Sequence, residues 1–158
     1  MLAPSDRGGY KCPMELNRDD AIRALNDIVE LELAGAVRFT QYSLMVFGHA
    51  RIPIMGWMRE QAAQSLMHAV QAGEEVTALG GKVSLGIAPL VGTHHPSVDE
   101  MLEEMLVQER RGVELYRNLL SVAEGCSVTL EELARQMIRN EELDVAEIQK
   151  MLRKRGDA

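Results

Sequence analysis

The chain has 158 residues, of which 46% are hydrophobic and 26% charged, so we expect one soluble globular domain with its own core. Its 24 acidic and 17 basic residues give a net charge of −7, which excludes the basic surface typical of duplex-binding proteins. No apolar run approaches the ~20 residues that span a bilayer, and the first 15 residues lack the apolar core of a secretory signal. The acidic balance and the lack of a long apolar run predict no nucleic-acid or membrane partner. With only Cys12 and Cys126, the sequence predicts no disulfide framework and a cytoplasmic location.

The first half of the chain predicts a tail and two long helices. Residues 1–16 contain two prolines and a Gly-Gly pair without any periodicity, so we expect a flexible tail ahead of a bundle over residues 17–155. A first helix is expected over about residues 17–47. A second is expected from about Pro53, a favoured first helical residue, to the glycine pair at positions 80 and 81.

The second half predicts two more helices, each with a capping signal at its start. Ser97 is followed three residues later by Glu100, and Thr129 is followed three residues later by Glu132. Both pairs have the spacing of a capping box, in which the two residues satisfy each other's free N–H groups. The third helix is therefore expected to run from Ser97 to about position 125, and the fourth from Thr129 to about position 153.

The connections between these segments predict how the helices are arranged. The links from the first to the second helix and from the third to the fourth are short, which makes each pair antiparallel neighbours. The segment Lys82–Pro96 is longer and contains several glycines and prolines. A chain of that length can extend ~50 Å, whereas a 27-residue helix is ~40 Å long. The sequence thus predicts an all-α four-helix bundle of two antiparallel hairpins joined by one long crossover.

Each predicted helix carries a stripe of residues spaced alternately three and four apart, the pattern that lines the core of a bundle. All four stripes are apolar at their ends and polar near their middle. The residues expected in the core are Leu25, Val29, Phe39, Met105, Tyr116, Met137 and Ile148. The polar positions are Glu32 in the first helix, Ser65 and His68 in the second, Glu109 in the third, and Glu141 and Asp144 in the fourth.

The polar positions fall at one level of the bundle, and this predicts a metal site. A single glutamate on an apolar stripe is usually a neutralised or salt-bridged core residue. Four acids with one histidine and no Lys or Arg on the stripes are different, because four uncompensated buried charges would be very unfavourable. They must take up protons or bind cations. Carboxylates with an imidazole and no thiolate suit iron, manganese or zinc. The expected ligands are Glu32, His68, Glu109, Glu141 and Asp144.

Four stretches of sequence carry a resemblance to a known family. They are Glu32-Leu33-Ala34-Gly35-Ala36, Ser65-Leu66-Met67-His68-Ala69, Glu109-Arg110-Arg111-Gly112 and Asn140-Glu141-Glu142-Leu143-Asp144. Through them the chain from about residue 17 to 153 resembles a bacterioferritin of the ferritin-like superfamily. The resemblance implies Fe(II) as the partner, a di-iron or single-iron centre, ferroxidase activity with dioxygen or peroxide, and iron storage. It places the family's six ligands on Glu32, Ser65, His68, Glu109, Glu141 and Asp144.

Two of those six positions depart from the family. The bridging glutamate of the second helix is Ser65, and the histidine of the fourth helix is Asp144. The number of acids stays at four, but a hydroxyl is a poor ligand beside a carboxylate and bridges two metals less well. We therefore expect Glu141, the remaining bridging acid, to share one metal position with Glu32 and His68. A second position would lie among Glu109, Glu141 and Asp144.

Other departures bear on cofactor and assembly. The family's haem methionine corresponds to Leu66, so no haem is expected. Few residues follow Asp144, so the family's short fifth helix is not expected either. We expect a homo-oligomer, a dimer at least, with the first two helices at the interface and a 12- or 24-subunit shell as larger alternatives.

Three functions remain open from the sequence. The first is an iron-oxidising and iron-storing protein with an altered centre. The second is a non-catalytic ferritin-like subunit that forms a structural dimer or co-assembles with a catalytic homologue. The third is a manganese or iron oxidoreductase that stores nothing.

Overall fold

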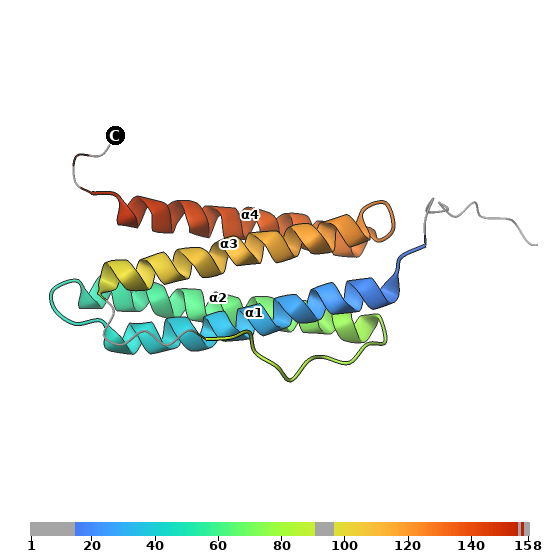
Figure 1. Ribbon diagram of the computed structural model, residues 1–158, viewed down its shortest axis with the longest axis horizontal. Coiled ribbons are helices and arrows are strands. Elements are labelled where there is room, and N and C mark those ends of the chain that lie inside the picture. The colour runs from blue at the N-terminus through green and yellow to red at the C-terminus, as the bar shows by residue number, and fades with distance from the viewer. Residues whose placement is uncertain (1–14, 91–96, 155, 157–158) are drawn as a thin grey trace, which may run out of the picture.

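The computed structural model describes residues 15–90, 97–154 and 156, which form four helices and no strand (Figure 1). The helices are α1 (Arg18–Met45), α2 (Arg51–Ala78), α3 (Val98–Ala123) and α4 (Val128–Leu152). α1 packs against α2 and α3 against α4, and the two hairpins meet along α1 and α3. The predicted all-α bundle of two antiparallel hairpins is confirmed, and no fifth helix follows α4 among the described residues. Residues 1–14, which make up most of the predicted tail, lie outside the described residues.

The helix starts confirm one predicted cap and correct another. The capping box of Ser97 and Glu100 is present at the start of α3. The predicted start of α4 at Thr129 with Glu132 is wrong, because Ser127 is the N-cap and its hydroxyl accepts the Leu130 N–H. Ser127 has the extended backbone that an N-cap needs, whereas Thr129 already lies within the first helical turn.

The crossover returns along α1 after a tight end to α2 (Figure 1). Gly80 adopts a positive φ of 78°, and the N–H groups of residues 80 and 81 bond back to the carbonyls of residues 77 and 76. This is a Schellman ending, which favours glycine. Asn26 of α1 then bonds the backbone at residues 82 and 84, and Glu30 accepts bonds from the Ser84 hydroxyl and, through its carbonyl, from the Ala88 N–H. The first part of the crossover is thereby fastened to α1.

The core consists of two apolar clusters, one toward each end of the bundle. The first joins the N-terminal half of α1 to the C-terminal ends of α2 and α3 and the start of α4. The second joins the C-terminal part of α1 to the starts of α2 and α3 and the end of α4. All seven residues predicted for the core are buried: Leu25, Val29, Phe39, Met105, Tyr116, Met137 and Ile148. The polar residues that interrupt the stripes lie between these clusters.

None of the four helices in the described part of the chain combines the length and the apolarity that crossing a membrane requires.

Candidate metal centre

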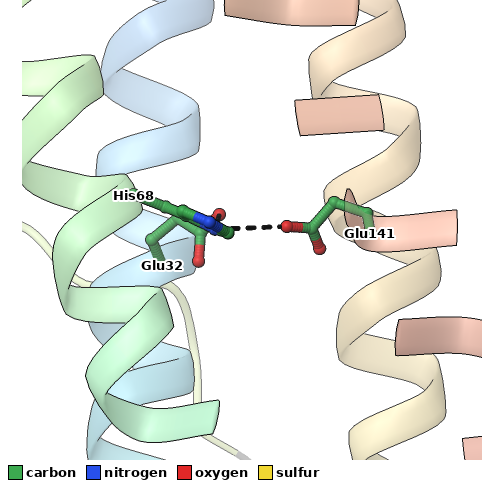
Figure 2. Close-up of side chains that lie close together, drawn as sticks. All are labelled: Glu32, His68 and Glu141. Atoms are coloured by element: carbon green, nitrogen blue, oxygen red, sulfur yellow. Dashed lines mark ion pairs between the residues drawn. The ribbon is translucent and has the colours of Figure 1, made fainter. Parts of the chain in front are cut away.

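Three side chains from three helices meet in the middle of the bundle (Figure 2). Glu32 comes from α1, His68 from α2 and Glu141 from α4. The Nδ1 atom of His68 lies 3.3 Å from Oε1 of Glu32 and 3.3 Å from Oε1 of Glu141. One ligand atom from each residue lies within 4.8 Å of the others, and all three side chains are buried. This trio is the group among the described residues whose geometry suits a metal ion.

Two further buried side chains adjoin the trio. Glu109 of α3 is 6% exposed and hydrogen-bonds the carboxyl group of Glu141. The Tyr116 hydroxyl donates to Oε1 of Glu32 at 2.9 Å. The layer therefore holds three buried glutamates, one histidine and one tyrosine. In the described part of the chain, no Arg or Lys forms an ion pair with any of these glutamates.

The surroundings raise the proton affinities of Glu32, Glu109, His68 and Tyr116. Burial raises the pKa of Glu32, and burial together with the charge of Glu141 raises the pKa of Glu109 well above its usual range. Burial would lower the pKa of His68, but its bonds to Glu141 and Glu32 outweigh that effect and raise the pKa to about 10. Burial and the charge of Glu32 raise the pKa of Tyr116 as well. Without a cation, this layer must therefore hold protons.

Asp144, the other predicted ligand of α4, is not part of the trio. It is half-buried, and Gln61 of α2 donates a hydrogen bond to its carboxylate. Burial and the charge of Glu141 raise the pKa of Asp144 to about 6. Asp144 and His68 both line a cavity of about 200 Å³ between α2 and α4, with Gln64, Met67, Asn140 and Leu143. Asp144 thus stands beside the trio, on the wall of a cavity that reaches His68.

Ser65, at the position of the lost bridging acid, is buried against α1. A Cβ atom placed on Gly35 would lie 2.9 Å from the Ser65 hydroxyl. The hydroxyl therefore occupies the contact between α1 and α2 at the level of the trio. Of the two metal positions expected from the sequence, the structure brings together the ligands of the one formed by Glu32, His68 and Glu141.

The donor set of the trio fits a divalent cation. Oxygen and nitrogen ligands lie ~2.0–2.2 Å from a first-row metal, so two ligands of one ion are separated by about 3–4.4 Å. The His68–Glu32 and His68–Glu141 distances of 3.3 Å fall within that range. A divalent ion would also replace the proton that His68 holds in its absence.

Three residues in or beside the layer were not singled out as site residues from the sequence, although their spacing marks them. Tyr116 follows Glu109 by seven residues, and Gln61 precedes His68 by seven, so each lies two turns away on the same helix face. Gly112 lies one turn after Glu109 and faces Glu141. A search for polar or small residues three or seven positions from the predicted acids and His68 would have found all three.

Comparison with known proteins identifies the fold. The ferritin-like domain family matches residues 22–156. A ferritin-like diiron-carboxylate protein from Bacillus anthracis str. Ames has a TM-score of 0.82 and 20% identity over 89% of this chain and 100% of its own. A dodecameric thioferritin, the bacterioferritin-related protein from Bacteroides fragilis, has a TM-score of 0.79 and 21% identity over 87% of each chain. Dps from Thermosynechococcus elongatus has a TM-score of 0.81 and 12% identity over 88% of this chain and 94% of its own. No curated protein matches the chain by sequence.

Proposed function

This chain belongs to the ferritin-like family, and on that premise we propose that it binds Fe(II) in the middle of its bundle and oxidises it. The observation that carries the proposal is the buried trio Glu32, His68 and Glu141, whose ligand atoms lie within 4.8 Å of one another. Two carboxylates and an imidazole suit iron, and also manganese and zinc. The choice of iron rests on the family and on the similarity to a diiron-carboxylate protein.

The residues of the layer would exchange protons for the metal ion. His68, protonated at neutral pH in the metal-free protein, has to lose a proton before its nitrogen can bind a metal. Asp144 lies on the cavity wall beside His68 and has a pKa of about 6, so it is placed to pass that proton toward solvent. Bound Fe(II) would supply electrons to dioxygen or peroxide. The protein would hold the ion and keep bulk water away from it.

The cavity between α2 and α4 offers an access route to the trio. Its wall carries the carboxylate of Asp144 and the amides of Gln64 and Asn140, and His68 also lines it. Carboxylate and amide oxygens attract hydrated divalent cations. We therefore assign Asp144 to guiding the cation inward, in addition to the ligand role expected from the sequence.

The outer face of the first hairpin supports self-association. A shallow groove on it is almost entirely apolar, with the lining residues Leu33, Ala36, Val37, Thr40, Leu66 and Ile87. We propose that a second copy of the chain packs onto this groove, which places α1 and α2 at a dimer interface. Leu66 would then face the partner with a side chain that offers no haem ligand. One of the similar structures is dodecameric, and iron storage in this protein would require a shell of that kind.

One observation favours the alternative, a non-catalytic subunit that co-assembles with a catalytic homologue. Ser65 packs its hydroxyl toward Gly35 and contributes no carboxylate, so the layer lacks one bridging acid. A single iron can still be bound by the trio, but paired electron transfer to dioxygen would need a second ion. The two functions differ in whether iron bound to the pure protein consumes oxygen.

Anaerobic Fe(II) titration of the purified protein, followed by exposure to oxygen with uptake recorded, tests the proposal. We expect saturable binding and oxygen consumption in the unmodified chain, and neither in Glu141→Ala. The matched control is Glu142→Ala, the neighbouring exposed acid that pairs with Arg117 on the surface. Binding without oxygen uptake would favour the non-catalytic subunit, and no binding at saturating Fe(II) would refute the metal site.

A further inference from the structure

Gly112 of α3 lies one helical turn after Glu109 and faces the side chain of Glu141. A Cβ atom placed on Gly112 would lie 2.5 Å from Oε2 of Glu141 and 3.2 Å from its Cδ atom. Real Cβ atoms essentially never come within 3.0 Å of another heavy atom. The carboxylate of Glu141 therefore occupies space that any residue other than glycine would fill.

The two oxygens of this carboxylate have different surroundings. Oε1 lies 3.3 Å from Nδ1 of His68, and Oε2 lies in the space left open at Gly112. The carboxyl group of Glu109 bonds to the same carboxylate. We propose that Gly112 is a positioning residue, whose missing side chain lets Glu141 reach His68 and Glu109 at once. This inference rests on the proposed function, because it assigns Gly112 a role in building the iron site.

Close packing of helices is the other common reason for a buried glycine, and the contacts at Gly112 argue against it. The three atoms that a Cβ there would meet first are Oε2, Cδ and Cγ of Glu141, all in the side chain. No backbone atom of α4 is among them. The absence of a side chain at Gly112 therefore makes room for the Glu141 carboxylate, rather than for the backbone of α4.

The first hairpin repeats this arrangement with a different occupant. Gly35 lies one turn after Glu32, just as Gly112 lies one turn after Glu109. A Cβ atom on Gly35 would lie 2.9 Å from Oγ of Ser65 and 3.0 Å from Nε2 of Gln108. Glycine inside a helix is less favourable than alanine, so its presence at both places has a packing cause. The space left open at Gly35 holds the Ser65 hydroxyl, and the space left open at Gly112 holds the carboxylate of Glu141, a proposed metal ligand.

This pair of glycines gives a matched test. Gly112→Ala and Gly35→Ala each add one methyl group to a buried helical position one turn after an acid. The first displaces Glu141, whereas the second displaces Ser65 and Gln108, which are not proposed ligands. Co(II) is the probe, because its visible absorption reports the ligand set and it suits nitrogen and oxygen donors. Binding is measured by equilibrium dialysis of the full chain, and folding by circular dichroism and thermal unfolding without metal.

We expect Gly112→Ala to bind Co(II) at least about tenfold more weakly, with an altered visible spectrum, while Gly35→Ala stays within about twofold of the unmodified chain. In the Gly112→Ala background, Glu141→Asp shortens the side chain by one methylene and withdraws the carboxylate from the new methyl group. The double variant should therefore bind more tightly than Gly112→Ala alone, a non-additive result. Unchanged binding and spectrum in Gly112→Ala would overturn the proposal.

Two further outcomes are decisive. If Gly112→Ala does not fold, recovery of folding and binding by Glu141→Asp supports the proposal, and failure of the double variant overturns it in favour of helix packing. If the unmodified chain binds no metal, the proposed function fails. A crystal structure of metal-free Gly112→Ala then still decides the role of Gly112. A carboxylate displaced from His68 supports positioning, and an unmoved one contradicts it.

Discussion

The two hairpins of the bundle are built alike but carry different side chains at the same level. The second helix of the first hairpin presents Ser65 and His68, and that of the second hairpin presents Glu141 and Asp144. Both hairpins bury apolar residues on either side of this layer. The fold therefore depends on the apolar ends that the hairpins share, and the chemistry depends on a few polar positions in which they differ.

Their outer surfaces differ as well. α1, α2 and the crossover together present the apolar groove that contains Val37 and Leu66. The second hairpin presents charged side chains, with exposed ion pairs such as Arg111–Glu114 and Arg117–Glu142. Exposed pairs of this kind contribute little to stability but keep a surface solvated. This difference is why we propose the first hairpin, rather than the second, as the dimer interface.

The largest expected effect compares the equivalent positions Glu141 and Ser65. Glu141→Ala should weaken Fe(II) binding by more than the ~10–100-fold that loss of an outer hydrogen-bond partner causes, because it removes a proposed ligand. Ser65→Ala should change binding less than about twofold. Anaerobic titration of both variants measures the difference. Equal effects at the two positions would show that the hairpins contribute alike.

A double substitution should make the hairpins more alike and add a metal position. Ser65→Glu with Asp144→His supplies a second bridging acid and a second imidazole. We expect metal content to rise from about one to about two ions per chain, with faster oxygen uptake. The metal-free variant should be less stable, since a further acid is buried. Metal analysis and thermal unfolding measure both, and unchanged metal content would contradict the expectation.

The two hairpins also differ seven residues after their first acid. Phe39 follows Glu32 in the first hairpin, and Tyr116 follows Glu109 in the second. Tyr116→Phe removes the hydrogen bond to Glu32 and makes the two positions alike. Since outer partners orient metal ligands, we expect Fe(II) affinity to fall about tenfold with little loss of helix content. Titration with circular dichroism measures this. An unchanged affinity would show that His68 alone orients Glu32.

The position of His68 between two acids predicts a pH dependence. Its pKa of about 10 means that metal binding near neutral pH releases its proton, so apparent affinity should rise about tenfold per pH unit for each proton released. In the metal-free protein, by contrast, the stability that His68 contributes falls as pH rises. The raised pKa contributes stability that is full below pH 6.5 and is lost as pH rises through about 10. Titrations from pH 6 to 9 test the first trend, and a flat profile would contradict it.

Substitutions on the outer faces of the two hairpins should have the smallest effect on metal binding. Val37→Lys places a charge in the groove of the first hairpin, and Val107→Lys places one on α3, where Val107 is 67% exposed. We expect Val37→Lys to shift the protein toward monomers in sedimentation at micromolar concentration, because a charge buried at an interface is unfavourable. Val107→Lys should leave the assembly and the metal affinity unchanged. Dissociation by Val107→Lys instead would place the interface on the other hairpin.

Much of the fold could be predicted because its signals are local. Glycines and short turns ended the helices where expected, and the three-four spacing identified core residues such as Phe39 and Met137, both buried. The start of α4 was missed because Ser127 and Thr129 both carry a hydroxyl that can cap a helix. The backbone of the preceding turn, with Gly125 at a φ of 73°, decided between them.

The sequence by itself determined that four helices would form and that acids and a histidine would share one level, because both follow from spacing along a helix. Only the tertiary structure decided which of them meet. Glu141 reaches His68 while Asp144 turns to Gln61, and the Tyr116 hydroxyl bonds Glu32 across the bundle. These contacts depend on how far each helix is rotated and tilted against its neighbours. Packing of the whole core sets that rotation, and at Gly112 it leaves so little space that a Cβ atom would lie 2.5 Å from Oε2 of Glu141.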